Sequence, residues 1–434
     1  PVFGSIFYVF MYNQFETRAM KKMLVRLNGQ MKLAYHQNEK LMQQVKEESD
    51  GEYGLYNYLY NVGSFPVYNN CQAEFFPLGQ DKYEEMLIQL KAAEKFIFME
   101  YFIVAEGKMW NSILEILKEK AANGVEVRFM YDGTCSLALL PYGYYKELGK
   151  YGIKSIPFSQ IRPALSTYQN NRDHRKILIV DGKVAFTGGV NLADEYINEK
   201  ERFGYWKDTA VMVRGKAVKS FTLMFLEMWN AVKKTDQDYQ KYLPETDYQA
   251  KQDGFIQPYA DSPLDDEHVG ESVYMNLIAH AKKEIYFTTP YLIITDEMNR
   301  ALGLAAKRGV DVRIVTPGIP DKKMIFLLTQ SHYEPLLKCG VKIYQYTPGF
   351  IHAKSFLCDD KIGTVGSINL DYRSLFLHFE CGVFMYKTKA LMQLKEDCMD
   401  TFAASEEMTL EFCRGQNVFI RIFQGMMRLF APLL

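Results

Sequence analysis

Apolar runs of strand length alternate with segments of helical periodicity, and the alternation occurs twice. The order of apolar run, helical segment and second apolar run is found at 96–98, 113–117 and 124–128, and again at 284–287, 302–304 and 309–313. Near-continuous apolar strands separated by helices are typical of parallel sheets covered by helices on both faces. We therefore predict an α/β fold with two similar α/β/α sandwich halves, each with a mixed, largely parallel sheet.

A polar, charged stretch with weak periodicity separates the two repeats at residues 233–254. Its composition is that of a linker. We place a first half at 51–245 and a second half at 246–434, with the pair packed pseudo-symmetrically around one site. The first half carries an insertion of about ten residues within 160–173, by comparison with the second half, and each half is near a usual domain size of roughly 200 residues.

The two ends of the chain are amphipathic. Residues 1–12 are apolar but shorter than the ~20 residues of a membrane-spanning helix, so they are either the end of such a helix or an ordinary amphipathic start. Residues 18–40 combine basic side chains with apolar ones at helical spacing, which is typical of a membrane-proximal segment, here residues 1–50. Residues 415–434 predict an amphipathic helix that lies either in a lipid interface or against the core.

Composition narrows the classes of partner. The formal net charge is −1, which disfavours a general nucleic-acid binder. The seven cysteines are scattered, without a C-x-x-C pair or His/Cys ligand spacing, so reduced thiols and no metal or other cofactor are expected.

The repeats share one chemical motif, H-x-K-x4-D. It reads His174, Lys176 and Asp181 in the first half, and His352, Lys354 and Asp359 in the second. The period of two along a strand places His and Lys on one face. Small residues and an asparagine follow each copy: Gly189 and Asn191 after the first, Ser367 and Asn369 after the second.

These groups suit a phosphodiester. One neutral imidazole would attack phosphorus and form a phosphohistidine, while a protonated imidazole would give its proton to the departing oxygen. Lys176, Lys354, Asn191 and Asn369 would stabilise the non-bridging oxygens, with Gly189 and Ser367 beside them. Asp181 and Asp359 belong to the catalytic motif, yet their position at a strand end next to a turn predicts that they fix that turn.

A nucleophilic imidazole needs a carboxylate or carbonyl on its other nitrogen to set its tautomer. Asp208 and Glu380 follow the two motifs at similar distances. We expect each of them to lie beside the histidine of its own half, His174 and His352 respectively.

The paired motifs resemble the phospholipase D superfamily, and their surroundings resemble its bacterial cardiolipin synthases. The resemblance covers roughly residues 65–434 and rests on the segments 186–191 with 195–196, 289–291, 309–313 and 366–374. It implies condensation of two phosphatidylglycerols into cardiolipin and glycerol at the cytoplasmic side of the cell membrane. It also implies that His174 is the nucleophile and His352 the acid, an order that the near-symmetric copies do not settle.

A lipid transferase also needs an apolar approach that favours lipid over water. Residues 135–140 and 322–328 occupy corresponding positions in the two repeats. They are candidates for the two sides of that entrance, with Lys322 and Lys323 near lipid phosphates. The alternative is that both segments are buried helices. Phospholipid hydrolysis, phosphatidylethanolamine as co-substrate, and a membrane-shaping protein with a decayed site remain alternative functions. The sequence does not indicate the oligomeric state.

Overall fold

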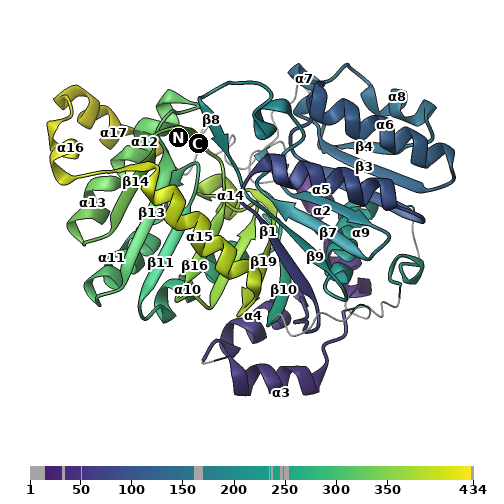
Figure 1. The fold of residues 1–434 in the computed structure, drawn as a ribbon, viewed down its shortest axis with the longest axis horizontal. Coiled ribbons are helices and arrows are strands. Elements are labelled where there is room, and N and C mark those ends of the chain that lie inside the picture. Colours follow the sequence, from purple (N-terminus) through teal and green to yellow (C-terminus); the bar gives the residue numbers. More distant parts are fainter. Residues whose placement is uncertain are drawn as a thin grey trace, which may run out of the picture.

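The computed structural model describes residues 15–31, 35–49, 51–160, 170–233, 235, 238–244, 248 and 254–431. The predicted apolar start at 1–12 lies outside this part of the chain, as does most of the predicted insertion within 160–173. Two sheets lie side by side in the molecule, one from each half (Figure 1).

The first sheet has seven strands. In spatial order they are β1 (Gln72–Phe76), β9 (Ala210–Arg214), β7 (Val184–Gly188), β6 (Lys176–Val180), β2 (Phe96–Tyr101), β3 (Glu126–Asp132) and β4 (Lys154–Phe158). β2, β3 and β4 pair in parallel, and the other neighbours pair antiparallel. The sheet is therefore mixed, with its parallel part limited to the three strands that helices connect.

The second sheet repeats this order. Its strands are β10 (Phe255–Asp261), β19 (His378–Tyr386), β17 (Ile362–Gly366), β16 (Ser355–Cys358), β11 (Glu284–Thr288), β13 (Asp311–Pro317), β14 (Lys342–Tyr346) and β20 (Ser405–Glu407). Again only the helix-connected strands β11, β13 and β14 are parallel to one another. The motif strands β6 and β16 occupy equivalent central positions, each followed by a hairpin to β7 or β17.

Helices cover both sheets. In the first half and its amino-terminal extension they are α2 (Phe15–Met31), α3 (Glu39–Glu48), α4 (Tyr53–Gly63), α5 (Gly79–Ala92), α6 (Lys108–Ala122), α7 (Cys135–Ala138), α8 (Tyr144–Lys150) and α9 (Val218–Lys233). In the second half they are α10 (Val269–His280), α11 (Asp296–Lys307), α12 (Lys323–Ser331), α13 (Tyr333–Lys338), α14 (Tyr372–Phe376), α15 (Lys389–Ala403), α16 (Leu410–Gly415) and α17 (Val418–Phe430).

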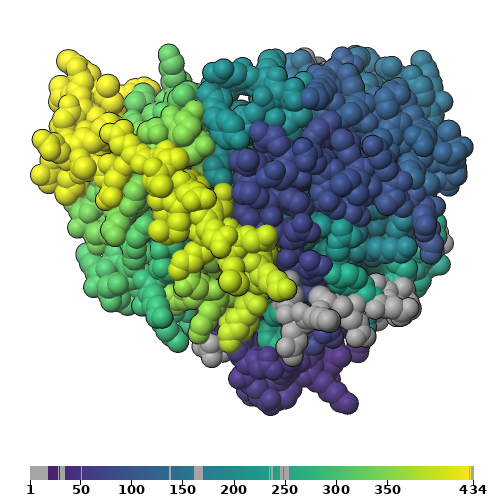
Figure 2. Space-filling model, in the orientation of Figure 1, coloured from purple at the N-terminus to yellow at the C-terminus, as the bar shows by residue number. Residues whose placement is uncertain are grey.

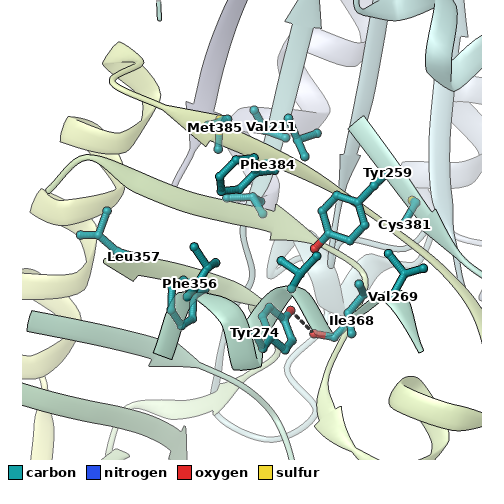
Figure 3. Packing of buried hydrophobic residues seen from close by; sticks show 14 of the residues in the cluster. Val211, Tyr259, Val269, Tyr274, Phe356, Leu357, Ile368, Cys381, Phe384 and Met385 are labelled. Carbon is teal, nitrogen blue, oxygen red and sulfur yellow. Dashed lines mark hydrogen bonds between the residues drawn. The ribbon is translucent and has the colours of Figure 1, made fainter. Parts of the chain in front are cut away.

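The halves share one hydrophobic core. One face of the first sheet and α9 belong to the same cluster of buried side chains as the second sheet, whereas α5 and α6 bury the opposite face of the first sheet in a separate cluster. Figure 3 shows part of the shared cluster, with Val211 of β9 near residues of β19. The Tyr274 hydroxyl donates to the Ile368 carbonyl at 3.0 Å, which satisfies a polar group inside this core.

Two short parallel pairings cross between the halves. β5 (Arg172–Asp173) pairs with β19, and β8 (Tyr205–Lys207) pairs with β15 (Gly349–Ile351). The backbone N–H of His174 donates to the Phe379 carbonyl at 3.0 Å, and that of His352 donates to the Lys207 carbonyl at 2.7 Å. Each motif histidine therefore follows a segment that is anchored to the opposite half.

The predicted basic helix is present as α2, and its apolar side faces protein. Leu27 is buried, Met20 and Leu24 pack against the core, and the Lys21 ammonium lies 3.1 Å from an Asp266 carboxylate oxygen. Arg18 and other basic side chains remain exposed. Among the helices of the described residues, none combines the length and apolar character needed to cross a bilayer. The membrane-proximal role of residues 1–50 stays a prediction.

Candidate active site

The two motif histidines open onto one pocket with a volume of about 690 Å³. Its lining includes His174, His352, Asn191 and Asn369 together with aromatic and aliphatic side chains from both halves. The apolar and aromatic members are Phe102, Ile103, Tyr196, Phe203, Trp206, Tyr291, Ile293, Ile325, Phe350, Tyr372 and Ala431. A pocket with a few convergent polar groups among apolar walls is suited to a lipid headgroup.

The carboxylates pair with the histidines in the opposite sense to our expectation. Glu380 Oε1 lies 2.8 Å from Nδ1 of His174, and Asp208 Oδ2 lies 2.7 Å from Nδ1 of His352. The prediction that each carboxylate serves the histidine of its own half is therefore wrong. The reason is the crossed strand pairing, because β19 brings Glu380 beside the segment before β6, and β15 brings His352 beside β8 and Asp208.

This geometry sets the tautomer of both imidazoles. When the Nδ1–H of each ring donates to its carboxylate, the lone pair remains on Nε2, the nitrogen on the far side of the ring. All four side chains are buried, with Asp208 and Glu380 at 0 % exposure, so water does not compete for these bonds. Each ring is thereby held for proton transfer or nucleophilic attack.

Gly189 and Ser367 support the carboxylates and are not among the lining residues, and their predicted contact with substrate stays a prediction. The Ser367 hydroxyl donates to Glu380 and accepts from the Cys381 N–H at 3.0 Å. A Cβ atom added at Gly189 would lie 2.0 Å from an Asp208 carboxylate oxygen. The absence of a side chain at Gly189 is therefore what allows Asp208 its position.

Lys176 and Lys354 are buried behind the histidines. Each ammonium donates to the carbonyl oxygen of the histidine two residues earlier, His174 or His352. Neither lysine is among the pocket-lining residues. Their positive charges lie close to the site, but their predicted direct contact with phosphate oxygens stays a prediction.

The asparagines lie at the pocket wall as expected, with different partners. Asn191 accepts from the Ile103 N–H at 3.0 Å and donates to the Tyr196 hydroxyl at 2.8 Å. The Asn369 side-chain oxygen is buried without a hydrogen-bond partner among the described residues. The two halves of the site are therefore similar but not equivalent.

Asp181 and Asp359 bind backbone N–H groups of neighbouring segments. The Asp181 carboxylate accepts from the N–H groups of residues 94–96 at 2.7–2.8 Å, and Asp359 accepts from those of residues 282–284 at 2.7–3.0 Å. Both have a positive φ, 54° and 51°, in the left-handed region that suits a turn. These contacts secure the far ends of the motif strands, as the position of both residues next to a turn predicted, and their place in the catalytic set stays a prediction.

Burial controls the charge of the site. Desolvation, followed by the charge of Lys354, lowers the pKa of His352 to about 4, and burial lowers the pKa of His174 well below its usual range. Burial also lowers the pKa of Lys176 to about 8 and that of Lys354 to about 7, and it raises the pKa of Glu380 to about 8. These shifts favour neutral imidazoles, and a bound phosphodiester anion would raise the pKa of the one that must act as an acid.

The predicted entrance segments differ from each other. Lys322 and Ile325 line the pocket, and Lys322 and Lys323 are exposed, as expected for a flank. In the first half Cys135 is buried, with its thiol donating to the Phe102 carbonyl at 3.0 Å. A residue that the core encloses in this way does not reach a lipid interface, so the prediction is wrong at Cys135.

His378 lines the pocket, a position that the sequence allowed for it without an essential role. Its ring centroid lies 5.3 Å from that of His174 and 6.4 Å from that of Phe102. Its place two residues before Glu380 on a strand, hence on the same face, is the signal that could have identified it. His174, His378 and Glu380 also present ligand atoms within 4.8 Å of one another, a spacing that would accommodate a metal ion among the described residues. The prediction that no metal is needed remains untested.

Comparison with known proteins agrees with this arrangement. A family model described as "Cardiolipin synthase, PLD-like domain" matches residues 86–229 and 274–401. Cardiolipin synthase of Alkalihalophilus pseudofirmus is 34% identical over 436 residues, covering 100% of this chain and 86% of that protein. Cardiolipin synthase 2 of Bacillus anthracis is 34% identical over 435 residues, covering 100% and 84%. An uncharacterized protein of Streptococcus mutans is 48% identical over 434 residues, covering 100% and 94%.

Among solved structures, phosphatidylserine synthase of Haemophilus influenzae has a TM-score of 0.63 and 13% identity, covering 88% of this chain and 97% of that one. At this identity the likeness shows the fold. The full-length relatives and the matching model show more: the chain belongs to the cardiolipin synthase family of the phospholipase D superfamily, and it is a phosphatidyltransferase.

Proposed function

We propose that the enzyme condenses two phosphatidylglycerols into cardiolipin and free glycerol through a covalent phosphatidyl-histidine. One observation carries the proposal: two imidazoles, each held at Nδ1 by a carboxylate of the opposite half, line one pocket. A pair of imidazoles that share a pocket supports one nucleophile and one acid on the same phosphorus.

In the first step, Nε2 of His174 attacks the phosphorus of the donor lipid. The P–O bond to the glycerol headgroup breaks, and His352 gives its proton to the departing oxygen. In the second step, a hydroxyl of the acceptor phosphatidylglycerol gives its proton to His352, its oxygen attacks phosphorus, and the P–N bond breaks. His174 is restored, and no cofactor takes part.

The buried charges support both steps. The Lys176 and Lys354 ammonium groups lie behind the histidines and offset the negative charge that builds on the phosphoryl oxygens. Asn191 and Asn369 are on the wall and are the candidates for direct hydrogen bonds to those oxygens. The aromatic lining favours a second lipid over water as the acceptor.

The site is proposed to work at the cytoplasmic face of the cell membrane, on anionic lipid and not on nucleic acid. Hydrolysis of the intermediate, or phosphatidylethanolamine as co-substrate, would use the same two histidines. The products distinguish these reactions: cardiolipin with glycerol for the proposal, phosphatidic acid for hydrolysis, and ethanolamine release for phosphatidylethanolamine use.

The test is product analysis with phosphatidylglycerol as the sole lipid. We expect cardiolipin and glycerol in equal amounts, and we expect both to vanish in His174→Ala. Phosphatidic acid as the main product would show that the enzyme is a phospholipase and not a synthase. Full turnover by His174→Ala would contradict the phosphatidyl-histidine mechanism.

A further inference from the structure

Helix α17 turns its large apolar side chains away from the protein. Gln424 and Met427 are buried, as is Ala431 just after the helix. Its most exposed apolar residues, with the exposed fraction of each, are Val418 60%, Phe419 77%, Ile422 56%, Met426 56% and Leu429 79%. An amphipathic helix normally buries such a face, because transfer of apolar surface out of water is favourable.

Contacts with neighbouring elements fix this orientation. Met427 and Ala431 pack in a small cluster with Ile293 and Leu328, the latter from α12. Two ion pairs tie the helix to α13 and α11: Arg421 to Glu334 at 3.7 Å and Arg428 to Asp296 at 3.8 Å. Figure 2 shows the carboxyl-terminal segment, in yellow, projecting at one edge of the molecule.

The exposed face lies beside the mouth of the active-site pocket. Ala431, directly after α17, lines the same pocket as His174 and His352. The start of α12, against which α17 packs, contributes the lining residue Lys322 and the exposed residues Lys323 and Met324. Apolar and basic side chains thus stand together at the entrance.

We propose that α17 and the first turn of α12 dock the enzyme on the surface of an anionic lipid bilayer, with the pocket mouth toward the headgroups. The proposal rests on the proposed function, because it takes the lipid substrate as the reason for this placement. The positive charges of Lys322 and Lys323 favour a lipid surface over a second copy of the chain as the partner. An anionic lipid surface would neutralise these two charges, whereas self-association through an apolar face would not need them.

The test uses the full chain and vesicles of phosphatidylglycerol with phosphatidylcholine, compared with phosphatidylcholine alone. The double variant Phe419→Glu/Leu429→Glu changes two exposed residues outside the pocket. The matched control Leu304→Glu/Met392→Glu adds the same charge at residues that are 58% and 66% exposed on α11 and α15. Turnover of short-chain, monomeric phosphatidylglycerol serves as the measure of an intact site.

We expect the α17 variant to lose at least about tenfold in binding to anionic vesicles, because two large apolar anchors are removed. The control should bind as wild type does, and both should keep turnover of the monomeric lipid. Equal vesicle binding by wild type and the α17 variant would overturn the proposal. The proposal would also be overturned if the wild type were a dimer, the α17 variant were a monomer, and both bound vesicles equally. Vesicle binding and product formation are measured separately. A failure of the proposed synthase reaction can therefore be distinguished from a failure of the proposed docking.

A separate observation concerns His378. Its side chain lies in the pocket at 9% exposure, and both ring nitrogens are buried without a hydrogen-bond partner among the described residues. Its Nδ1 is 3.9 Å from Glu380 Oε1, beyond hydrogen-bond reach. A buried polar ring without a partner is costly unless a ligand satisfies it.

The surroundings of His378 suit an anion. Arg172 is its register partner across the β5–β19 pairing, and Arg172, Arg373 and Lys322 all line the pocket. Burial, followed by the charge of Arg373, lowers the pKa of His378 well below its usual range. The ring is therefore neutral, with one N–H to donate.

We infer that His378 is a third imidazole of the site, which donates a ring N–H to a non-bridging oxygen of the phosphoryl group beside His174. His378→Phe keeps the ring volume without a donor, and His378→Asn keeps a donor. Loss of one oriented donor to a developing oxyanion costs about 10²–10³-fold. We expect a loss of that order in kcat/KM for the Phe variant and a smaller loss for the Asn variant.

The second measurement is the rate of phosphohistidine formation in a single turnover. If His378 had only a structural role, this rate would be unchanged in the folded fraction of each variant. Wild-type rates in His378→Phe would overturn the inference. Equal losses in the Phe and Asn variants would overturn it as well, since they would show that the donor has no effect.

Discussion

At the scale of single residues, the site depends on a carboxylate from one half and an imidazole from the other. Glu380 orients His174, and Asp208 orients His352. These pairs have separate consequences, because the proposed nucleophile forms the bond to phosphorus, whereas the proposed acid protonates the leaving group. A substrate whose leaving group needs no proton separates them.

Glu380→Gln and Asp208→Asn are each expected to reduce cardiolipin formation by about 10²–10⁴-fold, since an amide no longer holds the required tautomer. With the phosphatidyl ester of p-nitrophenol, release of p-nitrophenol should stay slow in Glu380→Gln but recover in Asp208→Asn. Rapid release in Glu380→Gln would mean that this carboxylate does not serve the nucleophile.

The lowered lysine pKa values predict a basic limb in the pH profile. The charge of Lys354 is lost as pH rises through about 7, and the charge of Lys176 is lost through about 8. The proposed nucleophile His174 is neutral across this range, because burial lowers its pKa well below the usual value. Glu380 becomes the carboxylate that orients His174 as pH rises through about 8. We therefore expect kcat/KM for short-chain phosphatidylglycerol, which reports the free enzyme, to pass through a maximum near pH 7–8 and to fall above it. A value that keeps rising to pH 9 would contradict this account.

At the scale of elements, the motif aspartates connect each motif strand to its neighbour through hydrogen bonds. Each accepts three backbone N–H bonds at the start of a neighbouring strand, β2 for Asp181 and β11 for Asp359. Such bonds to a charged acceptor stabilise the fold without touching the pocket. The contacts of the motif aspartates are therefore structural, whereas the motif histidines line the pocket.

Asp181→Asn retains an acceptor and tolerates the positive φ of 54°. We expect it to lower the free energy of unfolding by about 2 kcal/mol, because charge-assisted bonds are weakened. Asp359→Asn should behave alike. Denaturant unfolding measures the change, and kcat of the folded enzyme should stay near wild type; a large loss of kcat at full stability would assign the aspartates to catalysis.

The sequence predicted the repeated elements well and their pairing across the halves poorly. Strand and helix periodicities and turn residues are local features, so the motif strands β6 and β16 and the turns after them followed directly. The partner of Asp208 depends on β8 pairing with β15, a contact between segments far apart in the chain that no local pattern encodes. No specific role followed for His378 for a similar reason, because the pairing of β5 with β19 that places it beside His174 is also a long-range contact.

At the scale of the whole molecule, the site exists only where the halves meet. Crossed strands, the shared core and the contact between Thr187 and Cys381, whose Oγ1 and Sγ are 3.3 Å apart, join the two sheets. The covalent connection through residues 233–254 is therefore not what holds the pocket together. The division near 245 remains a prediction from composition.

Cutting the chain at a protease site introduced within 249–253 tests this view. The two fragments are expected to elute together and to retain most of the wild-type kcat, since the buried core between them persists. An enzyme cut in the same way after the Val211→Glu substitution, which places a charge in that core, should separate. Separation of the otherwise wild-type fragments under native conditions would contradict the account.

The most direct test of the central claim is to trap the covalent intermediate and map it. In His352→Asn, the p-nitrophenyl lipid can load the enzyme without an acid, but transfer to an acceptor is slowed because its base is missing. Mass spectrometry of the quenched, digested protein is expected to find the phosphatidyl group on His174. Cardiolipin formation by the wild type with no adduct in this variant, or an adduct on any residue other than His174, would contradict the account.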